Sequence, residues 1–321
     1  MPSSAPLSSL DTIASAYSLS SAYGRVVAYT AIFEGANFAT LSSSKIVEAN
    51  NGMSFRCSDY MYSYCIAPSK DLTDMKSVDD YPIPSATIFF VTPSHLMALT
   101  KSVLDNAKKS SFLLYSLAWR HKLSGILEGF FTKQSLWDRL VFDGARMQVM
   151  GKGAGTVRGI IVSGGVFIYN VDYTSLIVLV EPIESQVLTP ARVALSVPLV
   201  FVHSHPQVSG PVLATHPLDV QAFPAETASP GASAADNYAF SYLSAIGAPA
   251  INVETKLAGV DDAAVEDGQD PVGNLMIRGP SVGVLLDVEP KEGELDKGWI
   301  ESGERAKVMP NGTFKVVSAG K

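Results

Sequence analysis

Short apolar runs bounded by glycine or proline recur along this chain, and they constrain its fold more than any other feature. They cover residues 86–93, 157–165, 193–202, 251–260, 274–286 and 312–320. Runs of this length and composition predict β-strands. The earlier runs are almost continuously apolar, which is typical of a sheet covered on both faces by helices. The runs after about Gly247 alternate more, so we predict an α/β fold with a small, antiparallel β-rich part at its end.

Two segments have helical spacing instead. Within 111–131, apolar residues recur at Leu113, Leu117, Leu123, Leu127 and Phe130, with Arg120, His121 and Lys122 between them. Within 136–149, Leu136, Leu140 and Met147 share one face, and Asp138 and Arg146 lie away from it. We expect two amphipathic helices with leucine-rich buried faces, and we expect Asp138 and Arg139 to be solvated or to cap a helix.

Composition and charge exclude several classes of protein. The 321 residues are 47% hydrophobic and 17% charged, which is enough for a sizeable core. A net charge of −7 argues against a general nucleic-acid or anionic-membrane surface. The most apolar window, 159–183, is interrupted by Asp172 and Glu181, so we expect buried strands there and no membrane-spanning helix. Only Cys57 and Cys65 are present, and no basic leader precedes Arg25, so an intracellular location is expected.

Three of the five histidines lie close together in the chain. His203, His205 and His216 are followed by Asp219, and these are ligand types that a transition metal accepts. One interpretation is therefore a metal site made by these four residues. The other is a polar loop at the mouth of a former nucleotide pocket, and a resemblance to a known family favours it.

Several motifs resemble, in order and spacing, those of the long-chain fatty-acyl-CoA synthetases in the adenylate-forming, AMP-binding superfamily. They are LWDRLVF at 136–142, GTVRGIIVSGG at 155–165, GNLMIRGPSVG at 273–283 and KGWIESGERAKVMPNGTFKVV at 297–317. The resemblance extends from about Ser18 to Lys321. It implies part of the large N-terminal domain of such an enzyme, a layered and mainly parallel sheet with helices over 1–246. A β-rich subdomain follows over 247–321 and ends at the hinge, without the C-terminal lysine domain.

The resemblance also implies nucleotide-binding positions. The stretch PLVFVHSHPQVSG at 198–210 aligns with a family strand and loop that serve adenine, the ATP phosphates and Mg²⁺. His203 stands at the adenine-stacking Tyr, Pro206 at a Thr and Gln207 at a Glu. Glu304 stands at the Asp that binds ribose hydroxyls. The family's glycines that border adenine correspond to Gly164 and Gly165.

The activity implied by the resemblance is ATP-dependent conversion of a long-chain fatty acid to an acyl-adenylate and then to acyl-CoA. ATP, Mg²⁺ and coenzyme A are the implied cofactors and co-substrates. The implied location is the cytoplasm, or the cytosolic face of the endoplasmic reticulum or peroxisome. No nucleic-acid partner is expected.

Departures from the family pattern argue against turnover by this chain. Mg²⁺ favours anionic oxygen, and Gln207 offers only a neutral amide. Glu304 is one methylene longer than Asp, which displaces its carboxylate by roughly 1 Å. No segment matches the family's phosphate loop. We therefore predict an impaired ligase, with a non-catalytic remnant or binding module as the alternative and a histidine-cluster metalloprotein as the third interpretation.

One further segment has no counterpart in the family pattern. It runs from Val166 to Gln186, and we hypothesise that it is a retained short intron. It is apolar and β-prone, as aggregation-prone segments are. Together with an exposed sheet edge, it predicts self-association.

Overall fold

The structure is a computed structural model that describes residues 6–40, 85–110, 112–128, 130, 132–151, 153–163, 166–168, 177–179, 185–217, 247–283, 298–309 and 312–319. The chain divides into two compact units. Unit 1 comprises Met1–Ser18, Val27–Ile161 and Pro190–Leu199, and unit 2 comprises Leu19–Val26, Val162–Thr189 and Val200–Lys321. The predicted domains 1–246 and 247–321 remain a prediction.

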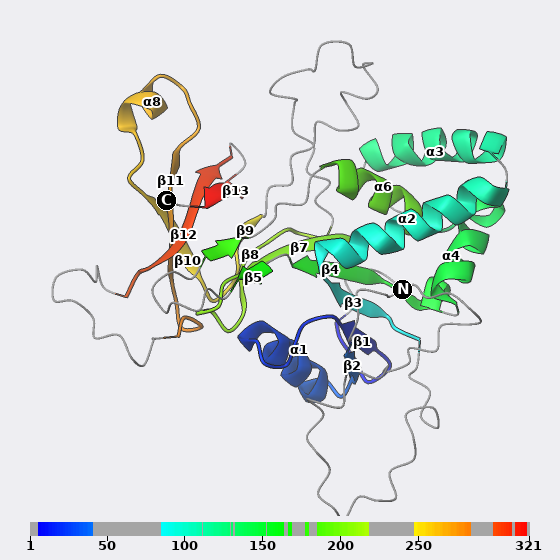
Figure 1. The fold of residues 1–321 in the computed structure, drawn as a ribbon, viewed down its shortest axis with the longest axis horizontal. Coiled ribbons are helices and arrows are strands. Elements are labelled where there is room, and N and C mark those ends of the chain that lie inside the picture. The colour runs from blue at the N-terminus through cyan, green and yellow to red at the C-terminus, as the bar shows by residue number, and fades with distance from the viewer. Residues whose placement is uncertain are drawn as a thin grey trace, which may run out of the picture. The chain divides into compact units, whose positions relative to one another are not determined.

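The larger sheet has the strand order β2-β1-β3-β4-β7-β8-β9. Its strands are β1 (Thr12–Ser15), β2 (Asn37–Thr40), β3 (Ile88–Val91), β4 (Gly159–Ser163), β7 (Leu199–Ser204), β8 (Pro211–Ala214) and β9 (Ala248–Pro249) (Figure 1). β1 pairs in parallel with β2 and with β3, so that Ile13 lies opposite both Phe38 and Ile88. β8 pairs antiparallel with β7 and β9. The predicted α/β fold with a layered sheet is confirmed.

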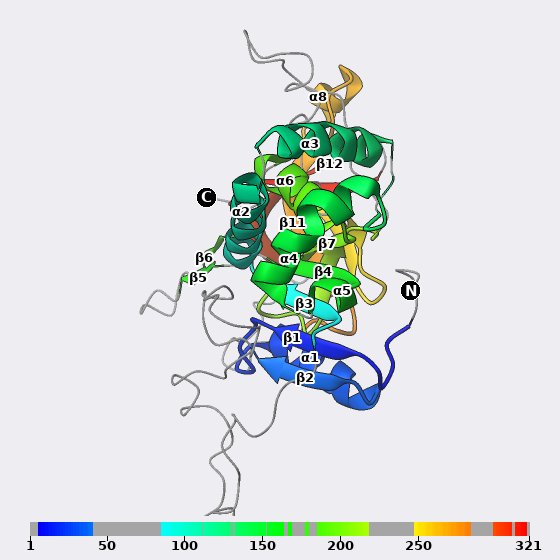
Figure 2. The same ribbon diagram turned by 90° about the vertical axis from the view of Figure 1, so that its right-hand side faces the viewer.

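The helices are α1 (Ala22–Phe33), α2 (Pro93–Ser110), α3 (Phe112–Leu127), the π-helix η3 (Asp138–Phe142), α4 (Asp143–Met150), α5 (Gly153–Thr156), α6 (Ser185–Leu195) and α8 (Asp262–Glu266). In unit 1, α2 packs against α3, η3 and α4, and these helices lie together in Figure 2. Leu96, Leu99 and Val103 of α2 are buried, as are Phe142 and Val149. These apolar side chains form the core of the helical part.

Our prediction of which helix faces are buried is wrong for α3 and for the η3–α4 segment. Leu113 and Leu117 are 76% and 53% exposed, and Leu136, Leu140 and Met147 are also exposed. The buried residues of these segments include three charged ones, Lys122, Asp138 and Arg146, at 5%, 0% and 1%. Asp138 is therefore neither solvated nor part of a surface pair with Arg139.

The burial of these charges has a physical reason. Asp138 Oδ2 accepts from Lys122 Nζ at 2.8 Å, and Asp138 Oδ1 accepts from Arg146 Nη2 at 2.8 Å. Arg146 also donates to the Ala194 carbonyl and the Ser196 hydroxyl. Burial alone acts to raise the pKa of Asp138, but the hydrogen bonds from Lys122 and Ser135 and the nearby Arg146 charge bring that pKa below its usual value. Buried charges persist only when they are paired in this way.

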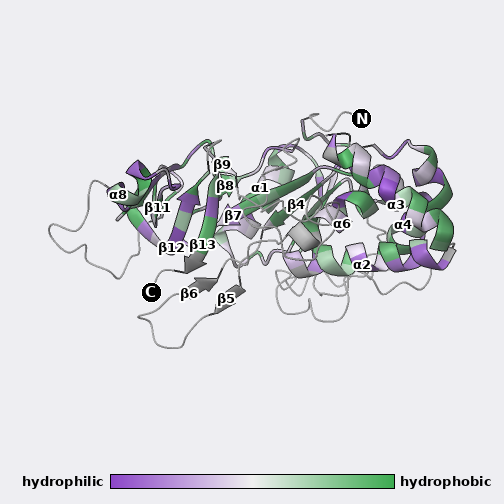
Figure 3. Ribbon diagram, turned by 90° about the horizontal axis from the view of Figure 1, so that it is seen from above, coloured by the Kyte–Doolittle hydropathy of each residue, from purple (hydrophilic) through white to green (hydrophobic). Residues whose placement is uncertain are grey.

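In unit 2, a four-stranded antiparallel sheet has the order β10-β11-β12-β13. Its strands are Glu254–Ala258, Val272–Arg278, Ile300–Val308 and Phe314–Ala319. Burial alternates along β11 and β12, and Figure 3 shows polar and apolar residues mixed along these strands. Their inward residues form one core with the β7–β8 region, comprising Val208, Val212, Leu213, Val253, Leu275, Ile277, Ala306, Phe314 and Val316. The antiparallel sheet predicted after Gly247 is confirmed.

The segment without a family counterpart contains two short strands. β5 (Val166–Ile168) and β6 (Ile177–Leu179) pair with each other, antiparallel, as a separate two-stranded sheet. Ser185 and Gln186, which we placed in the insert, belong to α6. The retained-intron hypothesis remains a prediction.

Candidate functional site

The last residues of β7 and the middle of β12 bring together two residues that the resemblance assigned to a nucleotide. His203 Nε2 lies 2.9 Å from Glu304 Oε2. The side chains are 0% and 2% exposed. The two atoms are close, but their geometry is not that of a hydrogen bond. Among the described residues, the two ring nitrogens of His203 and the two carboxylate oxygens of Glu304 have no hydrogen-bond partner.

A bulge in β12 positions Glu304. Asn274 pairs with Arg305 and Met276 pairs with Glu301, so Ser302, Gly303 and Glu304 lie opposite the single residue Leu275. Gly303 has φ of +74°, a conformation that glycine adopts readily. Ser302 and Glu304 are both buried, and the Glu304 backbone N–H donates to Ser302 Oγ at 3.2 Å. Bulges re-aim side chains next to functional sites, and this one directs the Glu304 carboxylate inward.

His205 completes this buried cluster. It is 5% exposed, and its Nδ1 accepts from the Gln207 backbone N–H at 3.2 Å. Burial and the neighbouring His203 lower the pKa of His205 to about 4, and Glu304 and a hydrogen bond to the Ser302 backbone only partly oppose that. His205 is therefore neutral at physiological pH. Both rings are thus enclosed in unit 2, and the interpretation as a polar loop at the mouth of a former nucleotide pocket remains a prediction.

The loop after β7 is anchored through its backbone. The Gln207 carbonyl accepts from the Gly283 N–H at 2.6 Å, and the Ser209 N–H donates to the Ser281 carbonyl at 2.9 Å. Val208 and Val282 form an isolated antiparallel bridge. Pro206 and Gln207 are half-buried in the turn that these contacts hold. Ser204 Oγ lies 3.0 Å from Ser163 Oγ, at the end of β4.

The remaining predicted site residues are His216, Gly164, Gly165 and Asp219. His216 is exposed and lies two residues after the end of β8. Gly164, Gly165 and Asp219 lie outside the described residues. In the part of the chain that is described, no group of three or more His, Cys, Asp or Glu side chains is placed to hold a metal ion. Ser302 was not predicted as a site residue, and the strand that holds it, β12, was not among the predicted strands.

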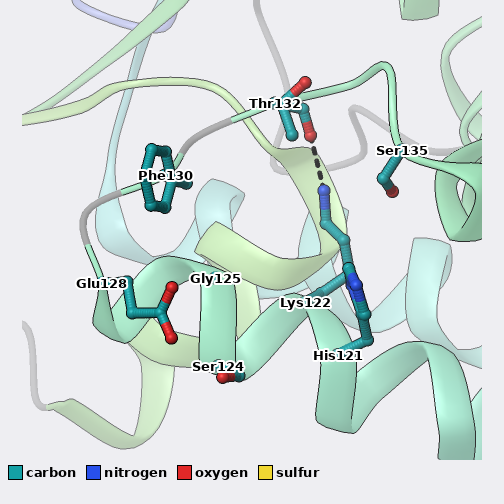
Figure 4. Close-up of a pocket in the computed structure, with 8 residues that line it drawn as sticks. All are labelled: His121, Lys122, Ser124, Gly125, Glu128, Phe130, Thr132 and Ser135. Carbon is teal, nitrogen blue, oxygen red and sulfur yellow. Dashed lines mark hydrogen bonds between the residues drawn. The ribbon is translucent and has the colours of Figure 1, made fainter.

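A separate hollow lies in unit 1, over the second half of α3 and the loop that follows it. Figure 4 shows this pocket of about 350 Å³, lined by His121, Lys122, Ser124, Gly125, Glu128, Phe130, Thr132 and Ser135. The lysine in this pocket is hydrogen-bonded within the protein, because Lys122 Nζ donates to the Thr132 carbonyl at 2.5 Å and to Asp138. None of the predicted nucleotide-binding residues lines it.

Comparisons with known proteins support the same lineage as the motifs. The chain is 27% identical over 248 residues to "Long-chain-fatty-acid--CoA ligase 5" of Mus musculus and 25% identical to "Long-chain-fatty-acid--CoA ligase 1" of Homo sapiens. Each match covers 76% of this chain and 30% of the relative. The chain thus spans less than a third of the length of these relatives. A search against models of protein families finds no match.

The solved structures that resemble this chain have low sequence identity to it. The structure titled "Crystal structure of IdnL7" matches with a TM-score of 0.51 at 16% identity, over 98% of this chain and 44% of that one. O-succinylbenzoate coenzyme A synthetase from Bacillus subtilis, solved with AMP, matches with a TM-score of 0.49 at 12% identity, over 98% and 42%. The likeness to the IdnL7 structure agrees with the predicted layered α/β fold. Among the described residues, no helix is both long enough and apolar enough to cross a membrane.

Proposed function

We propose that this chain comes from the long-chain fatty-acid–CoA ligase lineage and is impaired in the ATP-dependent step. That step converts a fatty acid to an acyl-adenylate before transfer to coenzyme A. The buried contact between His203 and Glu304 carries the proposal. The resemblance assigns these residues to adenine and to ribose, but here they contact each other and have almost no exposed surface.

The residues present do not fit ATP and Mg²⁺. A ribose needs a carboxylate whose oxygens can accept from its hydroxyls, and the Glu304 carboxylate is enclosed beside His203. Gln207 offers a neutral amide where a hard cation favours a carboxylate. The loop that holds Gln207 is tied through its backbone to residues 281–283, so a rearrangement toward phosphate would break these bonds.

The test is an assay of the full chain with palmitate, ATP, Mg²⁺ and coenzyme A, together with calorimetric titration of ATP and AMP. We expect neither pyrophosphate release nor palmitoyl-CoA, and no nucleotide binding. Turnover above a blank without protein contradicts the proposal. A His203→Tyr/Gln207→Glu/Glu304→Asp variant restores the family's residue types. If this variant binds nucleotide and the wild type does not, these three positions account for the loss of nucleotide binding.

A non-catalytic binding role is the alternative for the same fold. It predicts that the full chain binds palmitate or palmitoyl-CoA without releasing pyrophosphate. Titration with each lipid in the absence of ATP distinguishes the two roles. Binding indicates the binding role, and no binding indicates an impaired ligase that has lost its affinity for lipid.

A further inference from the structure

Helix α3 has apolar side chains on its inner side and also on its uncovered side. Ala118 and Ile126 are buried at 0% and 3%, and they form its inner side. Phe112, Leu113 and Leu117 are 72%, 76% and 53% exposed. Exposed apolar patches of this kind mark interaction sites.

The charges near this apolar side are mostly positive, and Asp105 is the negative one close to α3. No Asp or Glu occurs between Asp105 and Glu128. Lys108 and Lys109 end α2 directly before α3, and both are exposed, as is Arg120 within α3. The Lys108 ammonium lies 5.5 Å from the centroid of the Tyr115 ring, which places a cation against α3.

This segment therefore differs electrostatically from the chain as a whole. The exposed charged side chains of residues 101–122 carry a net charge of +3, whereas the whole chain has −7; they are Lys101, Lys108, Lys109, Arg120 and Asp105. The net charge of the whole chain argues against binding to an anionic membrane, but a net charge does not show how charges are distributed along the chain. Attraction to an anionic surface is local, because it decays within a Debye length of roughly 10 Å.

We propose that α3 is a lipid-binding helix that lies in the plane of an anionic membrane surface. Phe112, Leu113 and Leu117 enter the boundary between headgroups and acyl chains, and Lys108, Lys109 and Arg120 contact lipid phosphates. Interfacial helices combine these two features, and basic residues near an anionic leaflet add electrostatic attraction to its lipids.

One further observation favours lipid over a protein partner. Cores of protein interfaces are depleted in lysine, whereas this face has Lys108 and Lys109 at its edge. The proposal does not depend on the proposed function, because it invokes neither the β7 loop nor β12.

The test is co-sedimentation of the full chain with vesicles of phosphatidylcholine, alone or mixed with phosphatidylglycerol. We expect binding to the mixed vesicles that weakens as salt is raised. A Leu113→Gln/Leu117→Gln variant should bind at least about tenfold more weakly, since it removes apolar anchors. A Lys108→Glu/Lys109→Glu variant should lose the preference for phosphatidylglycerol.

The matched control is Phe33→Gln, which replaces a side chain that is 86% exposed on α1 and should leave vesicle binding unchanged. Circular dichroism checks that each variant is folded, which we expect because every substituted residue is exposed. Absence of binding to mixed vesicles overturns the proposal, as does equal binding by the Leu113→Gln/Leu117→Gln variant. Light scattering measures the oligomeric state of each protein. If the wild type is a dimer and the Leu113→Gln/Leu117→Gln variant is a monomer, the proposal is also overturned, because a second copy of the chain then covers this side of α3.

Discussion

His203 Nε2 lies 2.9 Å from Glu304 Oε2, and this contact joins the end of β7 to the bulged strand β12. Removing one member of a buried pair leaves the other polar group without compensation. We expect Glu304→Ala to lower the free energy of unfolding by about 3 kcal/mol. Urea denaturation measures the change.

The matched control for this variant is Glu301→Ala, on the same strand. Glu301 is exposed and accepts from Asn274 Nδ2 at 2.9 Å, so its loss should change stability by less than about 0.5 kcal/mol. Equal effects of the two variants would show that the buried contact contributes nothing. A His203→Leu/Glu304→Leu variant should recover much of the loss, because paired apolar replacement removes both buried polar groups.

The buried network around Asp138 gives a second prediction. Asp138→Ala leaves Lys122 and Arg146 buried without their carboxylate, so we expect a loss of about 3 to 5 kcal/mol. Its neighbour Arg139 is exposed, and Arg139→Ala should be close to neutral. Thermal melts of the two variants make the comparison, and a small effect of Asp138→Ala contradicts the network's role.

The lowered pKa of His205 predicts a pH dependence. His205 titrates near 6.5 when unfolded and at about 4 when folded, so between these values the unfolded chain binds a proton that the folded chain does not. The contribution of His205 to the free energy of unfolding is therefore complete above pH 6.5. It decreases by on the order of 3 kcal/mol as the pH is lowered to about 4.

Stability measured against pH in His205→Asn checks this prediction, since Asn keeps an acceptor for the Gln207 N–H. The variant should lose this part of the slope between pH 6.5 and 4. His121→Gln, at an exposed position, should keep it. The groups at Asp11 and Asp138 act at lower pH, because their folded pKa values lie below 3.8.

The segment without a family counterpart gives a fourth prediction. Deleting residues 166–184 removes the β5–β6 pair and leaves α6 intact from Ser185. We expect a larger monomeric fraction in size-exclusion chromatography and a sharper melting transition, because the removed segment is apolar and β-prone. Unfolding of the deleted chain would mean that the segment is integral to the fold.

The apolar runs and the order of motifs were sufficient to predict the α/β class, the antiparallel sheet after Gly247 and the lineage. Those features depend on local pattern, since period, turn residues and motif spacing are properties of neighbouring residues. The same local pattern was misleading for α3 and η3, where it predicted that the leucines face inward. A helical pattern identifies an apolar stripe, but it does not say whether another element covers that stripe.

Tertiary structure decided the charges and the site. Asp138 is buried because Lys122 and Arg146, from two other helices, reach its two oxygens, and no local pattern encodes that meeting. Likewise, the motifs placed His203 and Glu304 at separate nucleotide positions, whereas the β12 bulge turns the longer Glu304 side chain onto the imidazole. A buried charge is tolerated only where long-range partners compensate its lost hydration, so its position follows from the packed fold and not from the residues beside it.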